Sequence, residues 1–193
     1  MKMLSKREYF KEADQTSAVA TKRIFKLELL DWYGYPPERK MFELYKKHGK
    51  IKVGELNEEL KAWHKELADL RKRKVPFVRV HVVTLPLNDY LKFELGVYLL
   101  NEKAGEKIYL MDRELFNSIK RPKGVEPNDL LVVDETVFLT KYPVLKYGKY
   151  DDIVGAIRID ETSMVKKYKK YEDAILSKSV SLRQFIKIIE LAA

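Results

Sequence analysis

Residues 76–105 read PFVRVHVVTLPLNDYLKFELGVYLLNEKAG, and this stretch decides the fold class. Apolar and polar residues alternate through its first part, and this period of two predicts a β-strand over 77–84 inside a sheet. Asn88 or Asp89 can cap a helix that follows, and Gly105 can end that helix in the left-handed conformation. The apolar residues of the second part also fit a period of two, which leaves a strand open there.

The same patterns, followed outward in both directions, predict helices interleaved with strands. Strands are expected over 25–29, 108–110 and 153–159, with a hairpin over 130–142 that turns at 134–136. Helices are expected over 36–49, 56–70, 160–175 (capped by Asp160) and 181–191. We therefore predict an α/β or α+β fold with a central mixed sheet flanked by helices. Residues 1–20 would form an N-terminal helix or arm, and residues 21–193 a single α/β domain.

Composition adds two observations. Charged residues make up 35% of the 193-residue chain, the formal net charge is +9, and glutamine occurs only at Gln15 and Gln184. Abundant Lys and Glu with few amides and no cysteine is the composition expected of a hyperthermophilic, for instance archaeal, protein. A basic protein is attracted to polyanions such as nucleic acid, although a Lys-rich thermophilic surface also becomes basic without any partner. Both interpretations stay open.

Several compartments and chemistries are excluded. No run of about 18 apolar residues occurs, and the first residues lack the apolar segment of a secretion signal, so we expect a cytoplasmic protein without a membrane partner. The absence of cysteine removes disulfides, thiolate catalysis and cysteine metal sites. The histidines His48, His64 and His81 lie in three separate predicted elements without zinc-site spacing. We expect a surface His64, a hydrogen-bonded semi-buried His81, and no metal or cofactor.

Catalytic motifs are also missing. The eight glycines show no GxGxxG, GxxxxGK[ST] or GxSxG pattern. His48-Gly49-Lys50, with Glu55 after four more residues, imitates the HxKx4D signature of phospholipase D-like enzymes. That chemistry needs a nucleophilic histidine and a phosphate-holding lysine on one face of a strand, whereas this string lies at a predicted helix end. We therefore interpret it as a loop.

A second string, PNDLLVVDETVFL at 127–139, has the strand, Asp, turn and strand layout of that signature without its chemistry. Pro127 stands at the histidine position and Asp129 at the lysine position, so only Asp134 remains. Asp is also a favoured residue at the start of any tight hairpin turn. The layout favours a phospholipase D-like fold whose active site is lost, with no catalytic residue to assign.

The segments 25–31, 79–95 and 104–108 resemble a family of unknown function that is common in actinobacteria, has archaeal relatives and is often encoded beside helix-turn-helix regulators. The similarity runs from about residue 22 to 180. It includes the strand at 132–134 and the helix at 165–174. The resemblance implies cytosolic residence and a regulatory setting, and it brings no known activity. The actinobacterial members are less rich in lysine.

Two sets of residues are candidate sites. Arg79, Asp89, Tyr90 and Glu94 lie on the central strand, the loop after it and the first turns of the next helix, and ligands of α/β sheets bind at such strand ends. The structural alternative is that Asp89 caps the helix while Arg79 pairs with Glu94. The second set is basic and would follow a phosphate backbone: Arg71, Lys72, Arg73, Lys74, Lys166, Lys167, Lys169 and Lys170.

The tyrosines between the later lysines, Tyr168 and Tyr171, share a helical stripe with apolar residues, so we expect them in the core and the lysines on a solvated face. Three functions remain. The first is a non-enzymatic regulatory or nucleic-acid-associated accessory protein, whose partner would be nucleic acid or a DNA-binding regulator. The second is a small-ligand or nucleotide-binding sensor. The third is an enzyme with a divalent metal held by the carboxylates Asp31, Asp89, Glu94 and Asp134.

Overall fold

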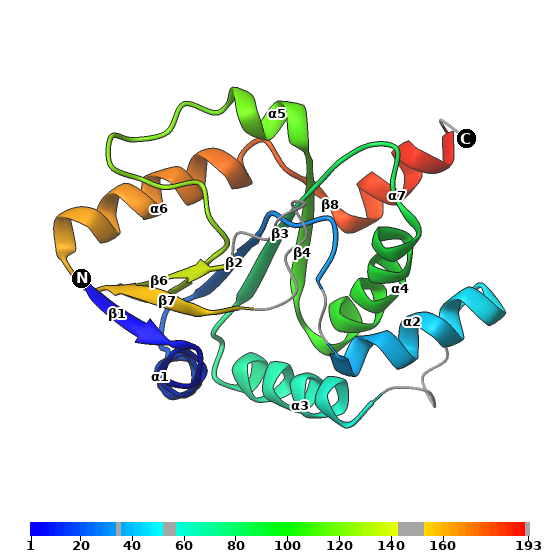
Figure 1. Cartoon of the computed structure of the whole chain (residues 1–193), viewed down its shortest axis with the longest axis horizontal. Coiled ribbons are helices and arrows are strands. Elements are labelled where there is room, and N and C mark those ends of the chain that lie inside the picture. The colour runs from blue at the N-terminus through cyan, green and yellow to red at the C-terminus, as the bar shows by residue number, and fades with distance from the viewer. Residues whose placement is uncertain (34–35, 52–56, 143–152, 192–193) are drawn as a thin grey trace.

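The computed structural model describes residues 1–33, 36–51, 57–142 and 153–191, and within them eight strands form one mixed sheet (Figure 1). The strands are β1 (Lys2–Ser5), β2 (Ile24–Glu28), β3 (Phe77–Val83), β4 (Lys107–Asp112), β5 (Leu130–Val133), β6 (Thr136–Lys141), β7 (Gly155–Ile159) and β8 (Val180–Ser181). The helices are α1 (Lys6–Ala18), α2 (Pro36–His48), α3 (Glu58–Lys72), α4 (Asp89–Ala104), α5 (Arg113–Ser118), α6 (Thr162–Leu176) and α7 (Leu182–Leu191). The predicted α/β class is confirmed.

The sheet has the strand order β1-β7-β6-β5-β2-β3-β4-β8. Its centre, β2, β3 and β4, is parallel, and every other pairing is antiparallel. Parallel neighbours need crossovers, which α2 and α3 supply between β2 and β3, and α4 supplies between β3 and β4. The N-terminal segment 1–20 contains β1, which pairs with β7 at one edge of the sheet.

Helices cover both faces of the sheet. Helices α5 and α6 pack on one face, where Phe116 and Tyr171 join a core built on alternate residues of β2 and β3 (Figure 1). On the opposite face, α1 and α3 pack over one half of the sheet, while α4 and α7 pack over the other. Because both faces are covered, all seven residues of β3 are buried, as predicted for a strand inside the sheet.

The segment after β3 is the predicted helix, and the strand that its period-two pattern left open does not form. Asn88 caps α4 by accepting a hydrogen bond from the Leu91 backbone N–H, and Gly105 ends it at φ +123°. The apolar pattern is ambiguous because α4 is buried on more than one side. It packs on the sheet and α7, and through Tyr90 and Phe93 on α2.

One predicted cap is wrong. Asp160 does not cap α6, whose N-cap residue is Glu161 without a side-chain cap bond. The Asp160 carboxylate instead accepts hydrogen bonds from Thr136 and Arg158, because these two groups on β6 and β7 lie beside it. The short elements β1, α5 and β8 were not expected, since each is too short to show a period.

No helix among the described residues is long and apolar enough to span a membrane.

Candidate functional site

A buried polar cluster lies on the inner strands, beneath α3 and α4. Arg79 on β3 donates two hydrogen bonds from Nη1 to the Glu28 carboxylate on β2, at 2.7 and 2.8 Å, and Nε donates to Glu106. Lys26 Nζ lies 2.6 Å from Glu28. Burial raises the pKa of Glu28, but Arg79 and Lys26 outweigh it and hold that pKa well below its usual value. Two cations and two carboxylates thus balance one another inside the protein.

His81 extends this cluster toward the ends of the strands. Its Nε2 lies 2.9 Å from the Leu30 carbonyl, and its Nδ1 lies 2.8 Å from the Tyr98 hydroxyl, which is also 2.9 Å from Glu28. Burial lowers the pKa of His81 and so favours the neutral imidazole. Because a carbonyl oxygen can only accept a hydrogen bond, Nε2 carries the proton and donates it to Leu30. His81 is fully buried, more so than the semi-buried residue predicted.

The predicted ligand set is divided among three settings. Arg79 belongs to the buried cluster. Glu94 is also buried, and it adds to the effects of burial and of Glu28 in raising the pKa of Tyr98. Tyr90 packs in an aromatic group with Trp32, at a ring distance of 4.7 Å. Asp89 is exposed and lies 3.3 Å from Lys92. Ligand binding by this set therefore stays a prediction.

The structural alternative proposed for the same set needs correction as well. Arg79 pairs with Glu28 and Glu106, because the register of the parallel strands places Lys26 and Arg79 side by side above Glu28. The helix cap is Asn88, one residue before Asp89. Glu28 and Glu106 were missed by the sequence reading. The signal for Glu28 was the lysine–glutamate pair on one face of a strand that otherwise looked half-solvated.

Asp129, at the lysine position of the phospholipase D signature, is also buried. It accepts hydrogen bonds from the Leu29 backbone N–H and from the hydroxyls of Tyr33 and Tyr142, at 2.7 to 2.8 Å. Burial raises its pKa to about 6 against these hydrogen bonds. In the described part of the chain, no histidine or lysine pairs with the Asp129 carboxylate.

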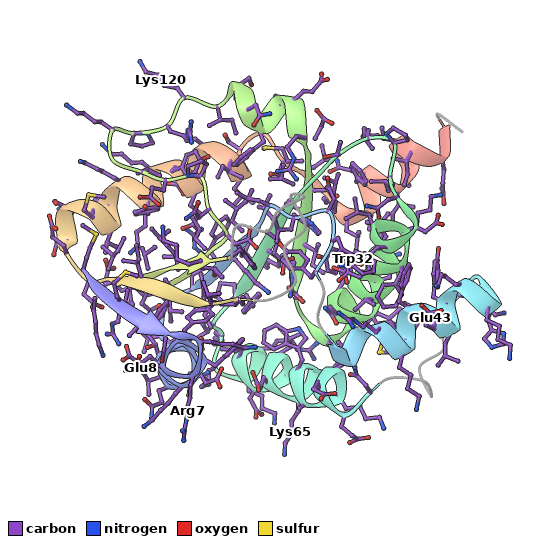
Figure 2. The ribbon with its side chains drawn as sticks, viewed as in Figure 1. Arg7, Glu8, Trp32, Glu43, Lys65 and Lys120 are labelled. Carbon is purple, nitrogen blue, oxygen red and sulfur yellow. The ribbon has the colours of Figure 1, made fainter. Side chains whose placement is uncertain are left out.

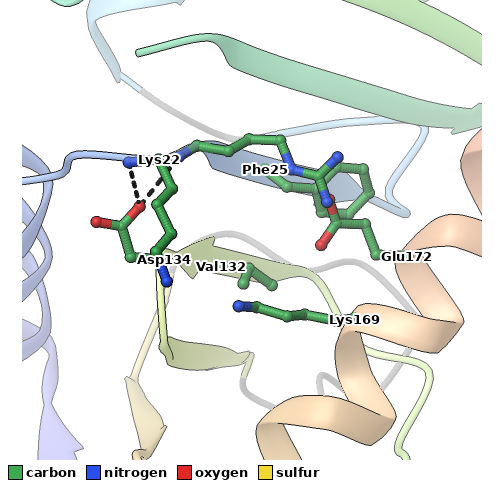
Figure 3. Close-up of a pocket in the computed structure, with 7 residues that line it drawn as sticks. Lys22, Phe25, Val132, Asp134, Lys169 and Glu172 are labelled. Carbon is green, nitrogen blue, oxygen red and sulfur yellow. Dashed lines mark hydrogen bonds and ion pairs between the residues drawn. The ribbon is translucent and has the colours of Figure 1, made fainter.

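Asp134 has a structural role in the hairpin turn between β5 and β6. It adopts φ +48°, and its carboxylate accepts hydrogen bonds from the backbone N–H groups of residues 21–23 (Figure 3). Burial acts against ionisation, but these backbone hydrogen bonds lower the pKa of Asp134. Asp134 therefore ties the hairpin to the start of β2.

The described residues of the string that imitates the phospholipase D signature, 48–51, do not form the strand that this chemistry needs. His48 is the last residue of α2 and is exposed, Gly49 follows at φ +68°, and Lys50 is exposed in the loop. Glu55 lies outside the described residues. The predicted helix end at this string is confirmed, and the rest of the loop interpretation falls on residues 52–56, outside the described part of the chain.

The carboxylates proposed for a metal site are similarly spread out. Asp31 accepts a hydrogen bond from the Thr84 backbone N–H, whereas Asp89 and Asp134 lie at the helix start and hairpin turn already described. Among the described residues, no group of three His, Asp or Glu side chains is arranged to hold a metal ion.

A small cavity of about 110 Å³ lies between α6 and the start of β2 (Figure 3). Glu172 on α6 is 1% exposed there and forms an ion pair with Arg23. Burial raises the pKa of Glu172 to about 7, although Arg23 opposes this effect. Lys22 and Lys169, which also line the cavity, both bind Glu135. Its cations are therefore already paired.

The lysines of α6 face away from the core. Lys166 and Lys170 are exposed and, in the described part of the chain, have no ion-pair partner. Lys167 donates to the Lys123 carbonyl and Lys169 binds Glu135. Tyr168 and Tyr171 are each 1% exposed, which confirms them as core residues.

The loop after α5 adds cations that the sequence reading missed. It runs along α6, where Gly124 approaches Met164, and Figure 2 shows Lys120 extending outward from it. The signal was the run Lys120-Arg121-Pro122-Lys123. Together these residues form what we call the α6 basic surface: Lys120, Arg121, Lys123, Lys166, Lys167 and Lys170.

The basic run at the end of α3 divides into two pairs. Lys72 binds Asp69 at 3.0 Å, and Arg73 donates to the Ala20 carbonyl at 2.9 Å. Arg71 and Lys74 instead line a second pocket, on the opposite face of the sheet from α6. The structure therefore does not join the two predicted basic sets into one stripe.

A family model for a domain of unknown function, DUF6879, matches residues 11–187. The fold resembles that of NucT from Helicobacter pylori, with a TM-score of 0.52, 12% identity, and 91% of both chains covered. It also resembles TrmBL2, described as an archaeal chromatin protein with a novel mode of DNA binding, with a TM-score of 0.51 and 10% identity. That match covers 91% of this chain but only 50% of TrmBL2. No match is found among curated protein sequences.

Proposed function

We propose that this chain, which belongs to the DUF6879 family of domains of unknown function, is a nucleic-acid-associated accessory protein without phospholipase D chemistry. It would contact the phosphate backbone through the α6 basic surface. The cytosolic and regulatory setting expected from the sequence, beside or together with a DNA-binding regulator, is part of this proposal.

The observation that carries the proposal is the set of uncompensated cations on one surface. Lys166 and Lys170 lie one helical turn apart, and side chains at this spacing are neighbours on a helix. Lys120 and Arg121 extend the positive charge from the adjacent loop. By contrast, two lysines beside this surface, Lys22 and Lys169, are paired with Glu135. When uncompensated cations neutralise phosphates, the nucleic acid releases its bound counterions, which is the main source of non-specific affinity.

The chemistry of the phospholipase D signature supports the non-enzymatic part. Pro127 and Asp129 stand where a nucleophilic histidine and a phosphate-binding lysine would be needed. Asp129 is held by two tyrosine hydroxyls, and Asp134 by backbone N–H groups. A carboxylate at the lysine position would repel a phosphodiester instead of holding it. The likeness to TrmBL2, whose described mode is DNA binding, is compatible with a polymer partner.

The test is the salt dependence of binding to a short duplex DNA, measured by fluorescence anisotropy. The slope of log K against log salt is about −0.9 for each phosphate neutralised, so Lys166→Ala with Lys170→Ala should reduce its magnitude by about 2. The matched control replaces two exposed lysines away from this surface, Lys11→Ala on α1 with Lys187→Ala on α7, and should leave the slope nearly unchanged. Equal losses in both double variants would mean that the net charge, and not this surface, attracts DNA.

A further inference from the structure

The second pocket differs from the first cavity in both its floor and its charges. It has a volume of about 360 Å³ and lies between the end of α3 and the first residues of β3 and β4. Its floor is apolar and consists of Leu67, Leu70, Val75, Pro76 and Phe77. The Phe77 ring is fixed from the side by Trp63, at a ring distance of 4.8 Å. The floor is therefore a rigid apolar surface at the start of the central strand.

The rim of this pocket is cationic. It is formed by Arg71, Lys74 and Lys107, all exposed. In contrast to Lys72, which pairs with Asp69, none of these three has an ion-pair partner in the described part of the chain. No Asp or Glu is among the described residues that line the pocket. Three positive charges are more than the negative end of the α3 dipole, about half a charge, can balance.

The backbone holds two of these cations in place. Lys74 adopts φ +59°, a left-handed conformation that follows directly from the end of α3, and its N–H donates to the Arg71 carbonyl at 3.0 Å. The Arg71 side chain passes close to Gly105, where an added Cβ atom would lie 3.5 Å from Arg71 Cδ. The end of one helix and the end of another thus place both cations at the same rim.

We propose that this pocket binds a small phosphorylated molecule with a flat apolar ring, of the mononucleotide class. The apolar floor would take the ring, and the three cations would take a phosphate dianion, because ionised partners form the strongest hydrogen bonds and ion pairs. A single carboxylate would leave two of the cations uncompensated. The volume lies near the lower end of the range for small-molecule pockets, which fits one nucleotide and not a polymer.

This site is independent of the α6 basic surface, because the two lie on opposite faces of the sheet. The pocket also differs from the predicted ligand set that contains Arg79. Arg79 and Phe77 both lie on β3, but Arg79 belongs to the buried cluster and does not line the pocket.

The experiment is isothermal titration calorimetry of the full chain at low salt, with adenosine 5′-monophosphate and cytidine 5′-monophosphate as ligands. Inorganic phosphate and the unphosphorylated nucleosides are titrated separately. We expect binding of the monophosphates that weakens about tenfold in Arg71→Met and in Lys107→Met, since each removes one charge while keeping an apolar stem. The control, Lys187→Met on α7, should bind like the wild type. Lys107 begins β4 and is exposed, so its variant tests the site even if Arg71→Met does not fold.

Three outcomes would overturn the proposal. Absence of monophosphate binding would do so directly. Binding of inorganic phosphate as tightly as the monophosphates would show that the apolar floor contributes nothing. An unchanged affinity in both rim variants would place the ligand elsewhere. Retained DNA binding in Arg71→Met, and retained monophosphate binding in the Lys166→Ala and Lys170→Ala variant, would separate this site from the proposed nucleic-acid surface.

Discussion

At position 79 an arginine lies inside the protein between two glutamates, and the three charges depend on one another. Removing the guanidinium would leave Glu28 and Glu106 buried without their main partner, so Arg79→Met is expected to lower the free energy of unfolding by about 3–5 kcal/mol. Urea denaturation at pH 7 measures this loss. As a control, Lys72→Ala breaks an exposed pair with Asp69 and should cost far less, because solvent screens such a pair. A similar cost for both variants would contradict the cluster as described.

Asp129 makes stability depend on pH. Its pKa is about 6 in the folded protein against 3.8 for an ordinary Asp, so the folded state binds the proton more tightly. The carboxylate is therefore unfavourable above pH 6, and this penalty is relieved as the pH falls from 6 toward 3.8. A difference of about two pH units corresponds to about 3 kcal/mol.

The measurement compares wild type with Asp129→Asn, which cannot titrate. The free energy of unfolding of the wild type, relative to the variant, should fall as the pH rises from 4 to 7. His81, with its lowered pKa, and Glu172, with a pKa raised to about 7, titrate in both proteins and cancel in the difference. A difference that is flat over this range would show that Asp129 is not a perturbed acid.

Among the elements, α4 depends on its first residues. The Asn88 side chain accepts a hydrogen bond from the Leu91 N–H at 2.8 Å, whereas Asp89 is exposed. Asn88→Ala should therefore cost about 1 kcal/mol in thermal or urea unfolding. Asp89→Ala, which removes only a charge at the positive end of the helix, should cost about 0.3 kcal/mol. A larger loss of stability in Asp89→Ala than in Asn88→Ala would show that Asp89 is the residue that caps α4.

The edge strand β1 is held by close contact with a glycine. A Cβ atom added at Gly155 would lie 2.2 Å from the Leu4 carbonyl oxygen, so Gly155→Ala should separate β1 from β7. Hydrogen exchange should then show loss of protection for the β1 amides, while the β3 amides in the same sample stay protected. Retained protection of β1 would mean that the backbone of β7 can shift to accommodate the methyl group.

For the whole molecule, the sequence predicted the parts whose pattern reflects burial. The strand around Val80, the helix after Asn88 and the hairpin at Asp134 follow from alternation, capping and turn chemistry. The α/β class followed from these elements. The partners of Arg79 could not be predicted, because they depend on strand register, which brings Glu28 and Glu106 together from distant parts of the chain. The placement of the basic residues of α3 and α6 on opposite faces of the sheet also depends on contacts between distant parts of the chain.

The sheet also acts as a partition. The α6 basic surface and the pocket at the end of α3 each lie on one side of a sheet whose central strand is buried on both faces. A polymer on one side and a small anion on the other would meet no common side chain. Each occupant could therefore bind while the other is already in place, which makes the two proposed sites separately testable.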